Sequence, residues 1–227
     1  MTAAVKTKRR RPKSELGPPT NGNRTRIRAR NEDKILDAAL EVFADYGFKG
    51  ATIDQIAARA GMSKPNLLYY FRRKRDLYVA VLERTLDMWL EPLSAIRADG
   101  DPAEEIRAYI NRKLEFSKVR PTASRMFANE IIQGAPLLKT ILHGGLRNIV
   151  DEKAAVIRGW AKAGKIADID PYHLIFVIWA VTQHYADFAS QVEAVVGGRL
   201  SDRKFFRETE SAIDHILLRG ILPTERI

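Results

Sequence analysis

The chain contains 227 residues with a formal net charge of +10, and its 45% hydrophobic and 29% charged residues are typical of a soluble globular protein with room for a small and a medium-sized domain. It has no cysteine, which excludes disulfide bonds, thiolate metal sites and cysteine nucleophiles, and its four histidines lack the close spacing of a metal-binding helix face, so no metal site is expected. The longest strictly apolar run, Leu174–Val181, is too short to cross a bilayer, and we expect a cytoplasmic protein without a membrane partner.

The first 30 residues carry almost all of the net positive charge. They contain ten Lys or Arg and one acidic residue, Glu15, which gives a net charge of +9. Prolines and glycines are frequent in this segment and disfavour packed structure, so residues 1–28 are predicted to form a disordered basic arm. Such an arm is either solvated without a specific role or follows DNA phosphates into a minor groove. A neighbouring DNA-binding motif favours the second interpretation.

Helical periodicity extends through the rest of the chain, and no alternation of apolar and polar residues predicts a strand, so we expect an all-α fold. Apolar residues between positions 35 and 46 share one face of a first helix, which Gly47 is suited to end. Asp76 is predicted to open a longer helix that ends or kinks at Pro92. Helix-start signals at Asp101-Pro102 and Asp170-Pro171 fit a further series of helices, predicted over 102–119, 123–133, 137–164, 171–188 and 202–219.

Residues 52–71 are predicted to form two short helices joined by a tight turn, the pattern of a helix-turn-helix. Thr52 and Ser63 are suitable N-caps, and Gly61 can adopt the left-handed conformation that the turn requires. Asparagine can pair with adenine edges, and lysine with guanine or phosphate. The alternative is an ordinary helical hairpin with a solvated basic end. The outward residues of the second helix are Lys64, Asn66, Tyr69 and Tyr70, followed by the basic run 72–75.

The segment 35–79, ILDAALEVFADYGFKGATIDQIAARAGMSKPNLLYYFRRKRDLYV, resembles the DNA-binding domain of the TetR family. The resemblance implies that Thr52, Tyr70 and Lys74 contact phosphates and that residues 62–69 face the bases. Two departures, Leu68 where the family often has Tyr and the less usual proline in the recognition helix, mean that no operator sequence carries over. The residues expected to bind DNA are Thr52, Lys64, Pro65, Asn66, Tyr69, Tyr70 and Lys74.

The resemblance also implies a domain organisation and partners. Residues 29–75 would form a three-helix DNA-binding domain, and residues 76–227 a helical domain for ligand binding and dimerisation, with a helix near 75–90 running between them. A homodimer would bind a palindromic double-stranded operator, as a repressor. Helices over 171–190 and 202–220 would form the dimer interface.

The C-terminal part resembles the pyrimidine-responsive regulators within that family, on ASRMFANEI, GAPLL and the segment from DEKAAVIRGW to QVEAV. This resemblance implies a pyrimidine base, such as uracil or thymine, as the effector. From this resemblance we expect neither a cofactor nor a catalytic residue.

Independently of the resemblance, polar residues inside apolar helices are candidates for ligand contacts. Trp179, Gln183 and Asp187 share one helix stripe. An amide can answer both the carbonyl and the N–H of an imide ring, and an indole can stack on it. Alternatively, the tryptophan is core and the glutamine bonds a neighbouring helix. Asn129 and Glu130 form a second polar pair, which either lines the same cavity or caps the kink before residues 134–136.

Two other classes of function are weaker interpretations of the chain. A small helical enzyme acting on nucleobases would need an acid/base or metal constellation, and none is evident. A basic architectural DNA protein would not need residues 100–223. Within the regulator hypothesis, a larger apolar effector is the alternative to a pyrimidine. We expect His184 to be a packed, hydrogen-bonded histidine.

Overall fold

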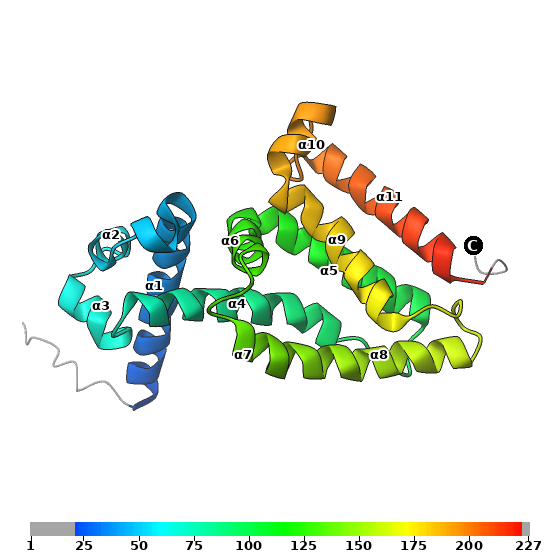
Figure 1. The fold of residues 1–227 in the computed structure, drawn as a ribbon, viewed down its shortest axis with the longest axis horizontal. Helices are drawn as coiled ribbons and strands as arrows, with labels where there is room; N and C mark the ends of the chain where they lie inside the picture. Colours follow the sequence, from blue (N-terminus) through cyan, green and yellow to red (C-terminus); the bar gives the residue numbers. More distant parts are fainter. Residues whose placement is uncertain (1–20, 224–227) are drawn as a thin grey trace, which may run out of the picture.

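The computed structural model describes residues 21–223, with side chains from residue 25 onward. Every regular element in this part of the chain is helical, which confirms the expected all-α fold (Figure 1). The elements are α1 (Asn21–Gly50), α2 (Ile53–Arg59), α3 (Lys64–Tyr70), α4 (Lys74–Ser94), α5 (Pro102–Val119), α6 (Pro121–Ile132), α7 (Lys139–Ile141), the π-helical turn η1 (Leu142–Leu146), α8 (Arg147–Lys162), α9 (Pro171–Asp187), α10 (Ala189–Val196) and α11 (Arg203–Ile221).

The N-terminal unit is built from α1, α2 and α3 around one apolar centre. Ile35 of α1, Ile56 of α2 and Leu67 of α3 are all fully buried there, and Leu77 of α4 closes the same core. Helix α4 then continues without a break into the C-terminal domain, as Figure 1 shows. The N-terminal unit and the second domain therefore share one continuous helix, as the sequence predicts.

The start of α1 differs from the sequence prediction. The helix begins at Asn21, so residues 21–28, which were assigned to the arm, are helical. An ion pair between Arg28 and Glu32, one turn apart at 2.9 Å, supports this added length. Residues 1–20, the rest of the predicted arm, lie outside the described part of the chain.

Three further boundaries differ from prediction for local reasons. Helix α4 begins at Lys74, and Asp76 lies in its first turn, paired with Arg73. Pro92 lies inside α4, which ends only two residues later, so the missing N–H interrupts little of the helix. The predicted helix over 137–164 is divided into α7, η1 and α8, and the π-helical turn contains a pair of glycines, which favour helix continuity least.

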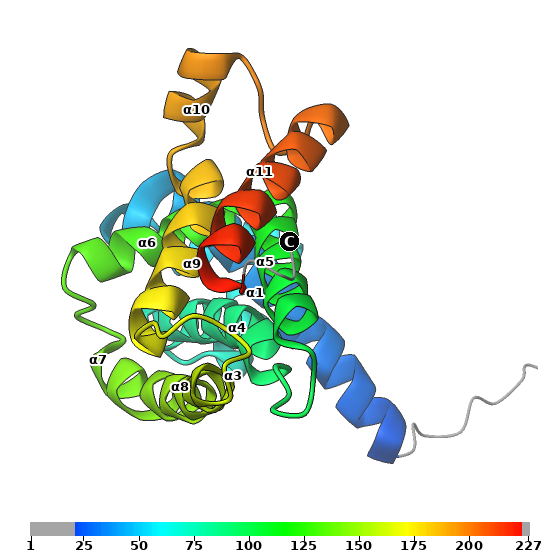
Figure 2. The ribbon, with the colours of Figure 1, turned by 90° about the vertical axis from the view of Figure 1, so that its right-hand side faces the viewer.

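The C-terminal domain is organised around α5. Helices α9 and α11 both pack on α5, and α4, α6 and α8 complete the bundle (Figure 2). Asp101 and Asp170 cap α5 and α9 as predicted, each through its Oδ1, which accepts hydrogen bonds from two backbone N–H groups. Helix α10, which the sequence analysis did not predict, follows α9 directly.

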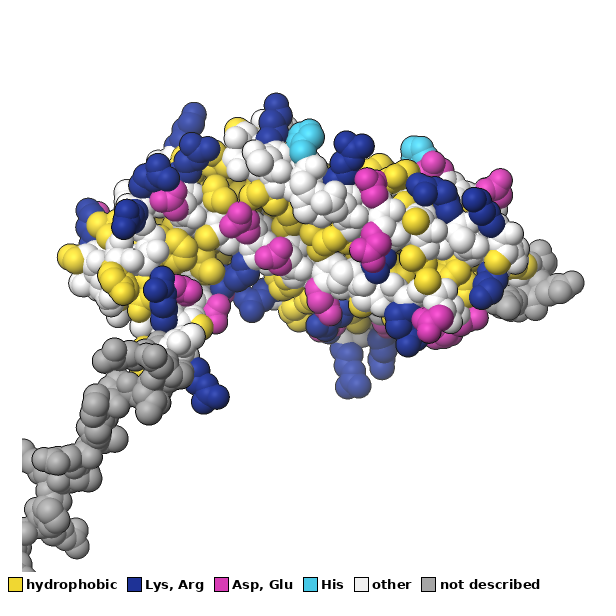
Figure 3. Space-filling model, turned by 90° about the horizontal axis from the view of Figure 1, so that it is seen from below, with side chains coloured by type: hydrophobic (Ala, Val, Ile, Leu, Met, Phe, Trp, Pro, Cys, Tyr) yellow, Lys and Arg dark blue, Asp and Glu magenta, His cyan; other side chains and the backbone are white. Residues whose placement is uncertain are grey.

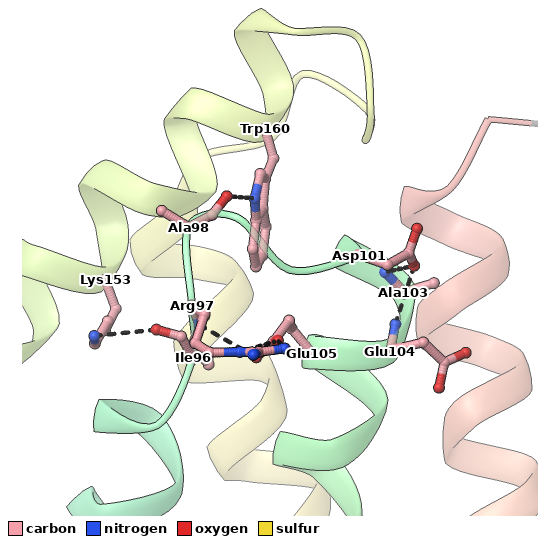
Figure 4. Close-up of polar contacts among 9 residues, drawn as sticks. All are labelled: Ile96, Arg97, Ala98, Asp101, Ala103, Glu104, Glu105, Lys153 and Trp160. Atoms are coloured by element: carbon pink, nitrogen blue, oxygen red, sulfur yellow. Dashed lines mark hydrogen bonds and ion pairs between the residues drawn. The ribbon is translucent and has the colours of Figure 1, made fainter.

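Side chains of α8 hold the loop between α4 and α5 (Figure 4). Lys153 Nζ donates to the carbonyl oxygen of Ile96 at 3.1 Å, and the indole N–H of Trp160 donates to that of Ala98 at 3.1 Å. Both side chains are buried. The far end of α4 is therefore fixed to α8 by hydrogen bonds that satisfy loop carbonyls.

Between residues 21 and 223, none of the helices has both the length and the apolar character that crossing a lipid bilayer would require.

Candidate functional site

The two short helices of the N-terminal unit are held in place by their caps. Thr52 Oγ1 accepts a hydrogen bond from the Gln55 N–H at 3.2 Å, and Gln55 Oε1 accepts one from the Thr52 N–H at 2.8 Å, which forms a complete capping box. Gly61 turns the chain with a φ of +62°. Ser63 Oγ then accepts from the Asn66 N–H and starts α3. These local interactions form a helix-turn-helix.

Helix α3 presents a polar face to solvent. Leu67 is fully buried and fixes the rotation of the helix against the core. The residues expected to face DNA bases therefore point outward, and the Tyr69 side chain is 72% exposed. Figure 3 shows Lys and Arg side chains projecting from this end of the molecule. The exposed residues of α3 are Lys64, Pro65, Asn66 and Tyr69.

Three residues expected at the DNA surface also have partners within the domain. Lys64 pairs with Asp54 of α2 at 2.8 Å. The Tyr70 hydroxyl accepts a hydrogen bond from the Asn31 amide at 2.9 Å. Lys74 Nζ donates to the Ala51 carbonyl at 2.7 Å, directly before the exposed Thr52. Lys74 therefore fixes the corner between α1 and α2, in addition to any phosphate contact.

The second domain contains a cavity of about 350 Å³ between α4, α5, α6, α9 and η1, which opens to solvent beside the exposed Ile132. Most of its lining is apolar, and three side chains bring N–H or carbonyl groups to it: Lys113, Trp179 and Gln183. The apolar residues of the lining are Leu86, Trp89, Leu90, Phe127, Ala128, Ile131, Ile132, Leu142 and Leu146. The structure thus brings Trp179 and Gln183 to one cavity.

Neither of these two predicted side chains has its full hydrogen-bonding capacity available. The indole N–H of Trp179 donates to the Tyr109 hydroxyl. Gln183 Oε1 accepts a long hydrogen bond, 3.4 Å, from Lys113 Nζ. The Trp179 ring and the Gln183 amide nitrogen therefore remain for contact with a ligand.

Asn129 and Glu130 do not line this cavity but a separate hollow that Phe43 and Tyr78 also line. Phe127, Ala128, Ile131 and Ile132 of α6 face the cavity, which leaves Asn129 and Glu130 on the other side of the helix. Asn129 is exposed. Glu130 Oε1 accepts from the Leu137 N–H at 2.8 Å and so closes the turn after α6, the second of the two alternatives that the sequence left open.

Glu130 also connects α6 to α4. Its Oε2 accepts a hydrogen bond from the Tyr78 hydroxyl at 3.3 Å. Burial, together with the Glu130 charge, raises the pKa of Tyr78 to about 12. This pair lies beside Phe43 and Phe48 of α1 and therefore joins the second domain to the N-terminal unit.

Asp187 lies one turn beyond Gln183 but does not line the cavity. It lines a neighbouring hollow with Arg125 and Tyr185. It accepts a hydrogen bond from Ser124 Oγ. Burial raises the pKa of its carboxyl, against the effects of that hydrogen bond and of the nearby charges of Lys113 and Arg125.

Lys113 is the residue of the cavity that sequence reasoning missed. It is 2% exposed, and burial lowers the pKa of its ammonium to about 7, although the charge of Asp187 opposes the shift. Its Nζ lies 4.5 Å from the centre of the Trp89 ring. A signal was present in the sequence, because Lys113 falls in the same helical register as the buried Ile106 and Ile110.

Comparison with known protein families divides the chain within α4. Residues 35–81 match the model of bacterial regulatory proteins of the tetR family, and residues 82–224 match that of the YcdC-like protein C-terminal region. The chain belongs to the TetR family. The resemblance noted in the sequence is thereby confirmed.

Relatives from this family match along most of the chain. The HTH-type transcriptional regulator RutR of Escherichia coli K12 is 52% identical over 204 residues, which cover 90% of this chain and 96% of RutR. The HTH-type transcriptional repressor NicS of Pseudomonas putida is 26% identical over 207 residues, 88% of this chain and 96% of NicS. This TetR-family chain is therefore a DNA-binding transcriptional regulator and not an enzyme.

Solved structures agree on the TetR-family fold. The structure of AibR in complex with isovaleryl coenzyme A and operator DNA superimposes with a TM-score of 0.64 over 82% of this chain and 97% of AibR, at 17% identity. FadR of Bacillus halodurans gives a TM-score of 0.63 over 83% of this chain and 94% of FadR, at 18% identity. At such identities the likeness concerns the fold alone.

Proposed function

We propose that the protein is a homodimeric repressor whose binding to a palindromic operator is controlled by a pyrimidine base, uracil or thymine, in the cavity between α4, α5, α6 and α9. The observation that carries the proposal is the chemistry of the cavity wall. Gln183 and Lys113 offer polar groups beside the faces of Trp89 and Trp179, inside an otherwise apolar lining. The sequence resemblance to pyrimidine-responsive regulators supports the same ligand class. It also supports a repressor.

A planar imide ring suits this combination of groups. Its carbonyl oxygens can accept from the Gln183 amide and from Lys113, while an indole face stacks on the ring. The volume of about 350 Å³ is at the small end of the range for ligand pockets. A single ring therefore uses the polar groups and fits the space.

A larger apolar effector is the alternative that the apolar lining favours. Such a ligand would displace water from Lys113 and Gln183 without replacing its hydrogen bonds, at a cost of about 1–3 kcal/mol for each buried group. That cost makes a ring with polar edges the better candidate.

On the DNA side, two copies of α3 would enter successive major grooves. Lys64, Pro65, Asn66 and Tyr69 would face bases, while Thr52, Tyr70 and Lys74 would contact phosphates. The dimer would use α9 and α11, where the apolar side chains Phe176 and Ile216 are 50% and 69% exposed. Residues 1–20 would extend the phosphate contacts.

Titration calorimetry with uracil tests the effector. The wild-type protein should bind uracil, and Gln183→Leu should bind it roughly 5- to 150-fold more weakly, because losing one buried hydrogen bond costs about 1–3 kcal/mol. Both proteins should remain folded and bind operator DNA. The same substitution at the exposed Gln133, outside the cavity, serves as the control.

Three results would change the proposal. No heat of binding with wild type removes the pyrimidine assignment, and equal affinities for both proteins remove Gln183 from the site. Binding of a medium-chain fatty acid in place of uracil favours the apolar effector.

A further inference from the structure

The polar groups that face the cavity are donors. Lys113 Nζ has three N–H groups, and its one hydrogen bond is the long contact of 3.4 Å to Gln183 Oε1. Because that oxygen is engaged, the Gln183 amide turns its N–H₂ group toward a ligand. The Tyr109 hydroxyl oxygen already accepts from Trp179. Among the described side chains that line the cavity, the acceptor capacity of the amide that remains is the second lone pair of Gln183 Oε1.

Lys113 also lacks a contacting counter-ion. Within the part of the chain whose side chains are described, no carboxylate lies within 4.0 Å of its Nζ, and its other neighbour is the face of Trp89. The nearest charge to act on it is that of Asp187 of α9, which is bound by Ser124 and faced by Arg125 of α6 and His184 of α9. A buried cation without a contacting anion favours a ligand that brings negative charge.

We propose that the cavity binds its ring as an imide anion, held by the Lys113 ammonium and the Gln183 amide, so that the effectors are cyclic imides with an acidic ring N–H. This inference rests on the proposed function and specifies the form of the ligand. In the binding step the ring N–H bond breaks and its proton passes to the neutral Nζ of Lys113. The negative charge spreads over the ring nitrogen and carbonyl oxygens, which accept hydrogen bonds from both side chains. No further reactant is needed.

A neutral ring in the same place would fit less well. It would bring no negative charge to Lys113, which has no carboxylate within 4.0 Å of its Nζ among the described side chains. The anion has one donor fewer and makes charge-assisted hydrogen bonds, which are roughly twice as strong as neutral ones.

Calorimetry of uracil and 5-fluorouracil between pH 6 and 9 tests the inference. Fluorine makes the ring N–H more acidic, so 5-fluorouracil should bind more tightly, by about ten-fold for each pKa unit that separates the two rings. Affinity for uracil should fall as the pH drops below about 7, because Lys113 is then already protonated and the ring must release its proton to water. Above that pH the proton transfer is internal, and affinity should stay level until the free ring ionises.

A neutral ring bound to the ammonium predicts the opposite profile, with affinity falling as the pH rises above about 7 and Lys113 loses its charge. Fluorine NMR gives an independent readout. At pH 7, bound 5-fluorouracil should have a chemical shift that approaches that of the free base in alkaline solution. A shift like that of the neutral base overturns the inference.

Matched lysine variants complete the test. Lys113→Met should lose the preference for 5-fluorouracil and flatten the pH profile, leaving only the contribution of Asp187. Lys153→Met replaces another buried lysine, which lies outside the cavity and donates to the Ile96 carbonyl, and should keep both properties (Figure 4).

Failure of this inference is distinguishable from failure of the proposed function. If neither base binds wild type, the proposed function fails. If both bind with equal affinity, or if the fluorine preference persists in Lys113→Met, only the anionic form is refuted. Should Lys113→Met not fold, the fluorine spectrum of the wild-type protein decides, because it reports the charge of the bound ring directly.

Discussion

The helix-turn-helix and the proposed effector cavity use polar side chains in opposite ways. In α2 and α3 the functional groups are exposed, and their positions are set by caps at Thr52 and Ser63 within the same short segment. In the cavity, Lys113 and Gln183 are 70 positions apart in sequence and come from different helices; Lys113 is buried and Gln183 is half-buried. Exposed groups act through charge that salt can screen, whereas buried groups act through desolvation and geometry.

The largest effect that separates the two regions should come from salt. If six or more phosphates are contacted, raising the salt from 50 to 200 mM should weaken operator binding by roughly 10³-fold or more. Uracil binding should change little, because the free base is uncharged and Lys113, the charged side chain of its cavity, is buried. Fluorescence anisotropy with labelled operator and calorimetry with uracil measure the two.

Removal of residues 1–20 measures how much of this salt dependence comes from the N-terminal arm. The slope of log affinity against log salt should become shallower by about 0.9 for each phosphate that the arm neutralises in the full-length protein. The folded domains should be unaffected, since α1 begins at Asn21. An unchanged slope would show that the arm does not bind DNA.

The second effect concerns the cost of burying Lys113. Lys113→Met should raise the free energy of unfolding by about 1–4 kcal/mol at pH 7, because an ammonium without a contacting counter-ion is replaced by an apolar side chain. The pKa of Lys113 is lowered to about 7 in the folded state, so the unfolded chain binds more protons between that pH and the ordinary lysine value. The free energy of unfolding of the wild type therefore increases with pH relative to that of Lys113→Met.

Urea unfolding of both proteins at pH 6 and pH 9 measures this difference. The gap should be larger at pH 6. A gap that is constant with pH would mean that Lys113 titrates normally in the folded protein.

The third effect distinguishes the residues that should contact bases from those that should contact phosphates. Asn66→Ala should reduce discrimination between operator and random DNA by roughly 1–3 kcal/mol if the amide makes a bidentate base contact. Lys74→Ala should weaken binding to both DNAs about equally and also destabilise the N-terminal unit, because its Nζ donates to the Ala51 carbonyl. Competition binding and thermal unfolding separate the two. Identical behaviour of the variants would contradict the division into base and phosphate contacts.

The smallest effect is expected at the cap of α2. Thr52→Val removes the oxygen that accepts the Gln55 N–H and should cost about 1 kcal/mol of stability, whereas Thr52→Ser should retain most of it. Uracil affinity should be the same in both variants. A change in that affinity would show that the cap and the cavity are coupled.

The sequence by itself determined the elements whose causes are local. Caps at Thr52, Ser63, Asp101 and Asp170 lie within three residues of the groups they bind, so the helix starts and the helix-turn-helix could be predicted. Family resemblance extended this to the class of protein. The helix predicted over 137–164 is present from residue 139 to 162, but apolar periodicity does not register the π-helical turn at residues 142–146 within it.

Only the tertiary structure decided which polar residues share a cavity. Trp179 and Gln183 meet there with Lys113, whereas Glu130 turns away to Tyr78 and Leu137, and Asp187 to Ser124. Helical spacing places residues on a face of their own helix but does not say which neighbour that face meets. The charge state of Lys113 depends on burial by α4 and α9 as well as by its own helix, and that burial exists only once the helices have packed.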